Sequence, residues 1–226
     1  MRPSHAQPEG AIIQPPMMRS RKSDCSMVTS GRFHRLTDVV IAAVWLGYAW
    51  ATLGVFRETN AIVPLILLVR NSTLTLLFLA RRPAKAQSTS ALEWGVAVLS
   101  TVSGYFFDGG TLVASGFALP LMIASGVLMT VSILALGRSF GIVPANRGIK
   151  TGGPYRVVRH PMYSCYVLFD LGYVMGAPST RNLLVLIAVV TSLFVRARYE
   201  ERILRRDPDY EAYAGRTPSM FVPGLL

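Results

Sequence analysis

The sequence predicts an all-α, polytopic integral membrane protein with about six transmembrane helices and a cytosolic C-terminal helical segment. Hydrophobic residues make up 51% of the 226 residues and charged residues only 15%, which is not the composition of an ordinary soluble domain. Several apolar runs approach the roughly 20 residues needed to cross about 30 Å of hydrocarbon. Lysine and arginine gather in polar segments that alternate with pairs of these runs.

Six apolar segments define the expected helices. They cover residues 36–56, 61–80, 91–107, 112–136, 162–175 and 183–195. The last two are short, so we expect them to tilt little or to continue as helices beyond the bilayer. Helices one to four therefore occupy residues 36–136. Residues 137–226 contain helices five and six and the C-terminal segment.

A polar segment of 35 residues precedes the first helix. It is rich in proline, serine and arginine and has no apolar run like that of a signal peptide. Such a composition cannot bury a core, so we expect residues 1–35 to form a disordered, basic cytoplasmic tail. Methionines at positions 17, 18 and 27 leave a later start of translation open.

The distribution of basic residues predicts the orientation. Under a six-helix arrangement, 20 of the 23 lysines and arginines fall on one side, in residues 1–35, 81–85, 137–160 and 196–226. Basic residues accumulate in cytoplasmic segments, so both termini are expected in the cytoplasm.

The same bias accounts for the net charge of +11, and we expect membrane lipids rather than nucleic acid as partners. The two cysteines, Cys25 and Cys165, do not have the spacing of a zinc site or a disulfide framework. No metal site is expected.

One polar stretch, residues 152–163, lies between two apolar regions and is expected to form a rigid elbow. Gly153 and Pro154 favour a turn, because glycine adopts positive φ freely and proline holds φ near −65°. Pro161 suits the first position of a helix, where its missing N–H would have no partner. The preceding residue, His160, is directed toward extended geometry. A titratable side chain at the mouth of a membrane helix is costly unless it binds something.

A second polar stretch, residues 196–213, follows the sixth apolar segment. If it is helical, Arg196 and Glu200 lie one turn apart on one face. The pattern also fits a juxtamembrane helix whose arginines meet anionic headgroups. The short connection between helices five and six brings both polar stretches to the same membrane face. Together they would enclose a pocket that a water-soluble reagent enters from one side and a lipid from the other.

These two stretches resemble the isoprenylcysteine carboxyl methyltransferase family, which belongs with the small membrane methyltransferases that include phospholipid N-methyltransferases. The resemblance rests on Gly-Pro-Tyr-Arg-x-x-Arg-His-Pro-Met-Tyr at residues 153–163, Glu-Glu-x-x-Leu at 200–204 and Tyr-x-x-Tyr at 210–213. It covers about residues 137–223. The first four helices agree only in hydropathy and number.

The resemblance implies an S-adenosylmethionine-dependent methyltransferase whose cofactor site lies in residues 137–226. In agreement, no Gly-x-Gly-x-x-Gly motif follows a predicted strand. By family position, the carboxylate of Glu200 compensates the positive charge of the cofactor and Arg196 orients the methyl acceptor. These two residues are therefore the implied catalytic pair. The residues implied to contact the cofactor are Arg147, Gly148, Ile149, Lys150, Tyr155, His160, Pro161, Met162, Tyr163 and Glu200.

The implied acceptor is a lipophilic or lipidated molecule from the membrane. A prenylcysteine carboxylate, a phospholipid amine and a small lipophilic thiol all remain open. A different class is a nicotinamide-dependent membrane lipid reductase, whose members have related C-terminal motifs but are expected to be longer. A third is a non-catalytic membrane protein that retains the motif as a scaffold. The joint presence of His160, Tyr163, Arg196 and Glu200 argues against the third class.

Two positions depart from the family pattern. Cys165 stands where glycine is frequent, and Asp207-Pro208 replaces Phe-Gly. We expect the first to alter close helix approach and the second to alter the packing of the C-terminal segment.

Two further questions stay open at this point. Tyr210 and Tyr213 have either a direct role or the role of interfacial anchors. Arg70 and Asp170 lie inside apolar segments, where charge is costly. They either pair with each other or are satisfied separately.

Overall fold

The computed structural model describes residues 31–108 and 116–225, and α helices make up most of this part of the chain. The helices are α1 (Gly31–Thr59), α2 (Ile62–Ala80), α3 (Ala91–Val102), α4 (Ala118–Leu136), α5 (Pro161–Gly176), α6 (Thr180–Leu204) and α7 (Pro208–Arg216). Short 3₁₀ turns form η1 (Ser103–Phe106), η2 (Gly137–Ser139) and η3 (Gly153–Arg156). Two-residue strands form β1 (Ala86–Gln87) and β2 (Ala145–Asn146).

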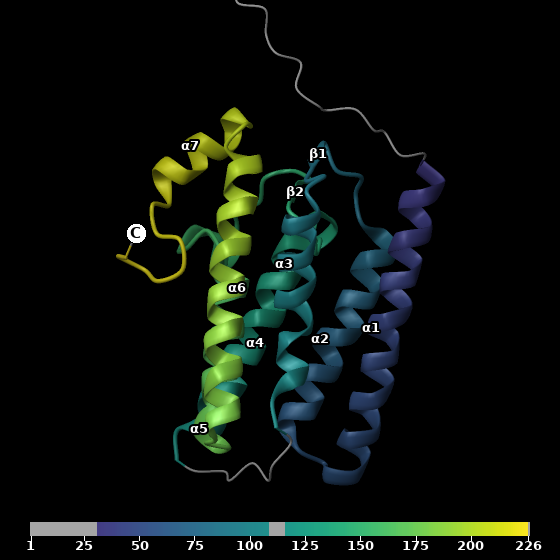
Figure 1. Cartoon of the computed structure of the whole chain (residues 1–226), viewed down its shortest axis with the longest axis vertical. Helices are drawn as coiled ribbons and strands as arrows, with labels where there is room; N and C mark the ends of the chain where they lie inside the picture. The colour runs from purple at the N-terminus through teal and green to yellow at the C-terminus, as the bar shows by residue number, and fades with distance from the viewer. Residues whose placement is uncertain (1–30, 109–115, 226) are drawn as a thin grey trace, which may run out of the picture.

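The predicted all-α membrane fold is confirmed. Four helices are long and apolar enough to cross a membrane, namely Arg35–Thr59, Ile62–Ala80, Ala118–Ser139 and Thr180–Leu204. Helices α3 and α5, with 12 and 16 residues, are shorter but run alongside the long ones (Figure 1). That the chain crosses the membrane six times therefore stays a prediction.

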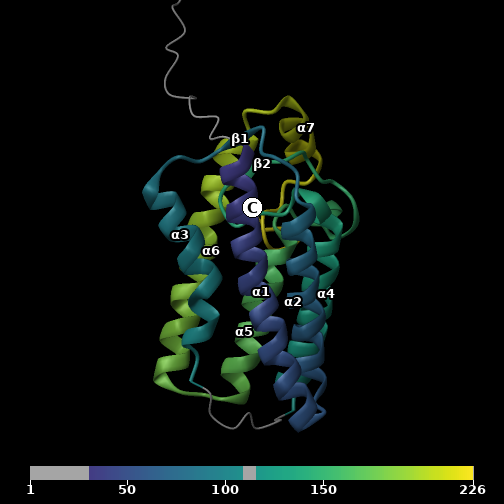
Figure 2. The same cartoon turned by 90° about the vertical axis from the view of Figure 1, so that its right-hand side faces the viewer.

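Helices α1 to α6 alternate in direction, so their connections gather at two opposite ends of the bundle (Figures 1 and 2). The start of α1, the strands, the end of α6 and α7 lie at one end, which we call the polar end. The basic segments 81–85, 137–160 and 205–216 belong to this end. The structure thus agrees with a shared face for the two polar stretches.

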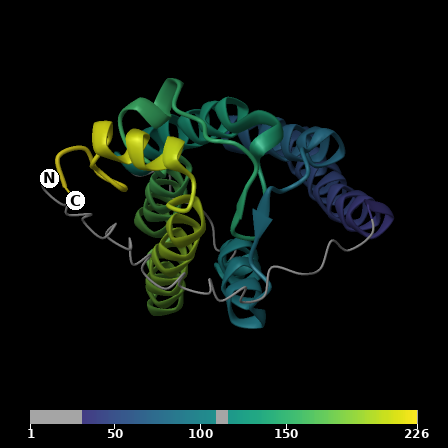
Figure 3. The same ribbon diagram turned by 90° about the horizontal axis from the view of Figure 1, so that it is seen from above.

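Strands β1 and β2 tie two connections together at the polar end. They pair antiparallel, with Ala86 opposite Asn146 and Gln87 opposite Ala145. Viewed from above, the pair runs across the end of the bundle toward α3 (Figure 3). This pairing fixes the loop between α4 and α5, which carries residues 147–150 of the candidate site.

Two boundaries differ from the sequence expectations. Helix α1 begins at Gly31, so residues 31–35 are helical rather than part of the tail. Residues 1–30 and the first part of the fourth apolar segment, residues 112–115, lie outside the described residues. Helix α6 extends past the expected end at residue 195 to Leu204, so the sixth apolar segment continues as a helix, which is one of the two expected outcomes.

Arg70 and Asp170 form no ion pair, and Arg70 contacts its sequence neighbour instead. Arg70 donates from Nε and Nη2 to Asn71 Oδ1, at 3.1 and 2.9 Å, and Asn71 donates to Thr52 Oγ1 at 3.2 Å. No ion pair joins Arg70 to Asp170 in the part of the chain that the structure describes. The half-buried Arg70 is therefore held by a neighbouring amide, which a hydroxyl group in turn holds in place.

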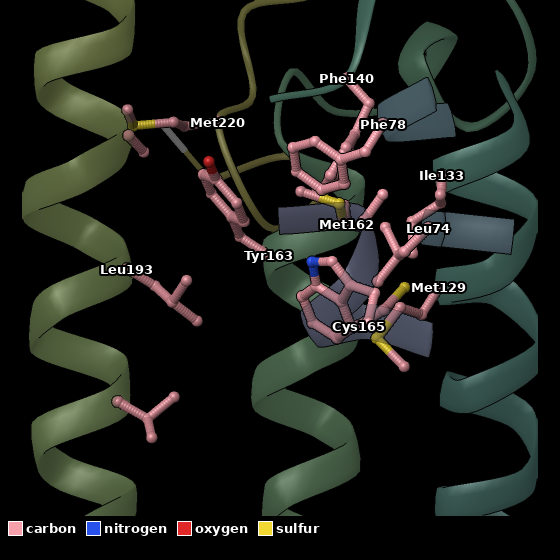
Figure 4. Close-up of a cluster of buried hydrophobic side chains, with 14 residues drawn as sticks. Leu74, Phe78, Met129, Ile133, Phe140, Met162, Tyr163, Cys165, Leu193 and Met220 are labelled. Atoms are coloured by element: carbon pink, nitrogen blue, oxygen red, sulfur yellow. The ribbon is translucent and has the colours of Figure 1, made fainter. Parts of the chain in front are cut away.

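Close packing of α4 against α5 holds the elbow in place. In the core beneath it, Met129 and Ile133 of α4 lie beside Met162 and Cys165 of α5 (Figure 4). Further down, Gly172 of α5 has no room for a side chain. A Cβ there would lie 2.7 Å from Met122 Cγ, 3.1 Å from the Ala118 carbonyl oxygen and 3.3 Å from Met122 N.

We therefore expect Gly172→Ala to destabilise the protein relative to Gly95→Ala. Overpacking costs about 1–3 kcal/mol, and an added Cβ at Gly95 of α3 meets nothing within 4 Å. Both changes raise helix propensity, so their difference isolates the packing term. Thermal unfolding in detergent measures it. Equal midpoints for the two variants would show that α4 and α5 separate easily.

Candidate active site

A cavity of about 100 Å³ lies at the polar end of the bundle, where the loop after α4, the elbow, α6 and α7 meet. Its lining residues are Leu136, Ser139, Phe140, Gly141, Val143, Ala145, Arg147, Gly148, Ile149, Lys150, Tyr155, Arg159, His160, Met162, Tyr163, Glu200, Leu204, Tyr210 and Tyr213. We call this the larger cavity. Nearly all of the residues predicted to contact the cofactor line it.

Two predicted site residues lie elsewhere. Pro161 is the first residue of α5 and does not line the larger cavity. Arg196 lines a second, smaller cavity of about 20 Å³. That cavity is lined by Trp45, Ser100, Thr101, Phe140, Ile142, Met162, Tyr166, Leu193 and Arg196.

The turn at Gly153 and the helix start at Pro161 form as predicted, whereas His160, with ψ of 57°, does not adopt the expected extended geometry. Gly153 has φ of 59°, a left-handed conformation that glycine adopts without strain, and it begins the 3₁₀ turn η3. Pro161 starts α5, and His160 at the N-cap makes no side-chain capping hydrogen bond. The backbone N–H groups of Arg159 and His160 donate to the carbonyls of Ser219 and Met220, at 3.0 and 2.9 Å. The C-terminal segment thus holds the elbow from outside.

The carboxylate of Glu200 joins α6 to α5. Its Oε1 accepts a hydrogen bond from the Tyr163 hydroxyl at 2.5 Å and another from Arg196 Nε at 3.3 Å. The latter contact confirms the predicted one-turn spacing. His160 Nδ1 lies 3.8 Å from Glu200 Oε2. The Glu200 side chain remains 18% exposed, so this negative charge is available inside the larger cavity.

Glu201, the neighbouring residue, has a different role that the sequence did not reveal. It is buried, and its Oε1 accepts from Arg159 Nε at 2.6 Å and from the Tyr210 hydroxyl at 3.2 Å. His160 Nε2 lies 3.4 Å from the same oxygen but makes no hydrogen bond. Glu201 therefore fastens the elbow and α7 to α6. Both Arg159 and Glu201 belong to the motifs, but motif spacing does not say which glutamate faces the cavity.

Arg196 is held tightly between the two cavities. It is 4% exposed, and its Nη1 donates to Ser100 Oγ at 3.1 Å and to Thr101 Oγ1 at 3.3 Å. Its Nη2 donates to the Gly141 carbonyl at 3.2 Å. The guanidinium carbon lies 5.2 Å from the centre of the Tyr163 ring, a cation–π contact. Helix α3 thus contributes to the site, which no motif in the sequence indicated.

A thin partition separates the cavities. Phe140 and Met162 line both of them, Gly141 lines only the larger one and Ile142 only the smaller one. Figure 4 shows Phe140 beside Met162, with Tyr163 extending from α5 toward α6. The hydroxyl of Tyr163 reaches Glu200 at the edge of this partition.

The tyrosines of the larger cavity are neutral hydrogen-bond donors. The Tyr213 hydroxyl donates to the Tyr155 carbonyl at 2.7 Å, and burial raises the pKa of Tyr213 to about 12. Burial also raises the pKa of Tyr155 well above its ordinary value. Tyr210 and Tyr213 are 3% exposed, so they are part of the cavity wall rather than exposed anchors.

The two departures from the family pattern both have structural explanations. Asp207 is the N-cap of α7, where its side chain accepts from Asp209 N at 3.2 Å, and Pro208 is the first residue of the helix. Asp207 Oδ2 also accepts from Asn146 Nδ2 at 2.8 Å, which ties α7 to β2. Cys165 packs in the core and is 1% exposed.

Within the described ranges, no group of three or more histidine, cysteine, aspartate and glutamate residues is arranged to hold a metal ion. The chemistry of the larger cavity is that of a carboxylate, two arginines, a lysine, a histidine and several phenols.

Comparison with known proteins finds similarity in the part of the chain that contains most of this site. Residues 108–207 match the family described as phospholipid methyltransferase. The chain is 29% identical over 157 residues to protein-S-isoprenylcysteine O-methyltransferase B of Arabidopsis thaliana, covering 65% of the chain and 77% of that protein. It is 33% identical over 141 residues to the cobalt-zinc-cadmium resistance protein CzcN of Cupriavidus metallidurans, covering 57% of the chain and 61% of that protein.

The matched range includes the elbow, Arg196 and both glutamates, and the relatives extend the similarity beyond it. The resemblance seen in the motifs is therefore confirmed: over residues 108–207 the chain is similar to the phospholipid methyltransferase family, and one similar protein is an isoprenylcysteine O-methyltransferase.

Proposed function

We propose that the protein is an S-adenosylmethionine-dependent methyltransferase that acts at the membrane surface on a lipophilic or lipidated acceptor. The observation that carries this proposal is the position of Glu200. Its carboxylate lies in the larger cavity and is bound through one oxygen to Tyr163 and to Arg196, which lines the smaller cavity. One carboxylate thus connects a site for a cationic cofactor to a site for a second reactant.

The residues of the larger cavity fit S-adenosylmethionine. The cofactor carries a sulfonium, an amino group and a carboxylate, and it would supply an activated methyl group. Glu200 offers a partly exposed negative charge to the cationic centres, and charge-assisted contacts of this kind are stronger than neutral ones. Tyr155, Tyr210 and Tyr213 provide aromatic wall area. Hence Arg147 to Lys150, Tyr155, His160, Met162, Tyr163 and Glu200 would hold the cofactor, and Pro161 would set the direction of α5.

In this proposal the acceptor approaches through the smaller cavity. Arg196 would orient its polar group, because a planar guanidinium fixes a carboxylate or phosphate in a defined direction. Phe140 and Met162 would keep water from the reacting centre. The protein mainly supplies alignment and electrostatics for an in-line transfer. A carboxylate acceptor needs no general base, whereas an amine or thiol must lose a proton.

The relatives leave the acceptor class open. One relative is named for isoprenylcysteine and the matching family for phospholipid. A prenylcysteine carboxylate, a phospholipid amine and a small lipophilic thiol are all candidate acceptors. The competing class, a nicotinamide-dependent lipid reductase, is distinguished by which cofactor the purified protein binds.

We also propose that both termini lie in the cytoplasm. Reporter fusions after Lys85 and after Arg206 should then both report the cytosol, and a fusion after Asp108 the opposite side. The reason is that basic segments are retained in the cytoplasm, and the six-helix arrangement assigns 20 of the 23 lysines and arginines to one side. A fusion after Arg206 that reports the opposite side would contradict an even number of spans.

Glu200→Gln should weaken binding of S-adenosylmethionine. Loss of a charge-assisted contact costs roughly 1.5–3 kcal/mol, which is about 10- to 150-fold in Kd. Calorimetry on the detergent-solubilised protein measures this change. Glu211→Gln serves as the control, because Glu211 is exposed and pairs only with Arg205 among the described residues. Unchanged affinity in Glu200→Gln would remove that role, and no binding by the parent protein would remove the proposed function.

Arg196→Lys should separate acceptor orientation from cofactor binding. Lysine keeps the charge but loses the planar arrangement of donors. We expect methyl transfer to fall by about tenfold or more, since misorientation costs at least a kcal/mol or two of barrier. Cofactor affinity should stay near that of the parent.

Cofactor binding and single-turnover methylation are to be measured on the same preparation, with the exposed Arg198→Lys as the matched control. Equal rates for Arg196→Lys and the parent would make Arg196 a structural residue of α6, and the acceptor site would have to lie elsewhere.

A further inference from the structure

Arg147 is a buried cation without an acidic partner. Its side chain lines the larger cavity, and only 7% of the residue is exposed. Its Nη2 donates to the neutral Gln87 Oε1 at 3.3 Å, and its buried Nε makes no hydrogen bond. No ion pair reaches it from any described carboxylate. A buried charge in this condition is costly unless an anion joins it.

The surroundings of Arg147 increase the need for an anion. Burial, and then the charge of Arg81, lower the pKa of Arg147 to about 10. The charges of Asp38 and Glu200 act in the opposite direction, but Asp38 is paired with Arg81 and neither carboxylate forms an ion pair with Arg147. At pH 7 the guanidinium remains protonated, so the uncompensated positive charge persists under physiological conditions.

The backbone makes specific room for this guanidinium. A Cβ at Gly141 would lie 2.9 Å from Arg147 Nη1 and 3.3 Å from its Cζ. Strand pairing places Gln87 opposite Ala145, which brings the amide of Gln87 to Arg147 Nη2. The absent side chain at Gly141 and the amide of Gln87 therefore hold the Arg147 guanidinium inside the protein, away from solvent.

From this geometry we infer that Arg147 binds the carboxylate of the methionine part of S-adenosylmethionine and makes the protein select for a carboxylated cofactor. This inference rests on the proposed function. The cofactor combines one carboxylate with two cationic centres, and the larger cavity combines one unpaired arginine with the carboxylate of Glu200. Two opposite charges of the protein thus match the two opposite charges of the ligand and fix its direction.

An acceptor with an anionic group is the other source of such a carboxylate or phosphate. Arg147 does not line the smaller cavity, whose cation is Arg196. Binding measured without any acceptor distinguishes the two sources, because only the cofactor is then present.

The test compares S-adenosylmethionine with decarboxylated S-adenosylmethionine by calorimetry in the absence of acceptor. The parent protein should prefer the carboxylated ligand by about tenfold or more, as expected for a charge-assisted contact. Arg147→Gln should remove most of this preference, by weakening the carboxylated ligand and leaving the decarboxylated one unchanged or slightly tighter. Lys150→Gln tests the less buried cation that lines the same cavity, and Arg156→Gln is the control, because Arg156 is exposed and does not line the cavity.

Three outcomes would overturn the inference without affecting the proposed function. They are equal weakening of both ligands in Arg147→Gln, a parent protein without preference, and loss of the preference in Lys150→Gln instead. If Arg147→Gln fails to fold, Gly141→Ala retains Arg147 but crowds its guanidinium, and it should reduce the same preference. Failure of the parent to bind either ligand would instead contradict the proposed function itself.

Discussion

The arrangement of the candidate site depends on the hydrogen bonds that the buried carboxylate of Glu201 accepts. It accepts hydrogen bonds from Arg159 of the elbow and from Tyr210 of α7, and it lies on α6. Losing one partner of a buried pair leaves an uncompensated charge, so such a contact strongly favours a single arrangement. Successive residues of a helix point about 100° apart. With Glu201 directed into the protein, Glu200 is directed to the cavity.

The same contact explains how a membrane helix positions polar chemistry. Helix α6 is 25 residues long and carries Arg196, Glu200 and Glu201 in its last third. Each of these charged side chains contacts a different element: Arg196 contacts α3, Glu200 contacts α5 and Glu201 contacts the elbow. The polar end of the helix is thus held by tertiary contacts, whereas its apolar part needs only hydrocarbon or neighbouring helices.

Local patterns in the sequence predicted the fold class and the elbow. Apolar runs indicated the helices, Gly153 and Pro161 indicated the turn and the start of α5, and the spacing of Arg196 and Glu200 indicated a shared helix face. These features depend on backbone preference and helix period, which act over a few residues. The end of α6 was less predictable: the apolar run at residues 183–195 is shorter than the observed helix Thr180–Leu204, because polar residues held by tertiary contacts extend it.

What the sequence could not predict depends on contacts between distant residues. Nothing local indicates that Ser100 and Thr101 hold Arg196, or that Gln87 reaches Arg147 across a two-residue strand pair. The hydrogen bonds from Arg70 to Asn71 likewise depend on the side-chain rotamers of both residues, which the sequence does not specify. The roles of the individual site residues in binding and catalysis stay predictions, since motifs place residues near one another without saying what they contact.

The partition at Phe140, Gly141 and Ile142 also separates the helices that line only the smaller cavity from the segments that line the larger one. Helices α1 and α3 supply Trp45, Ser100 and Thr101 to the smaller cavity and no residue to the larger one. These three positions also precede the range that matches the family. Substitutions at these three positions can therefore reshape the smaller cavity without replacing any side chain that lines the larger one.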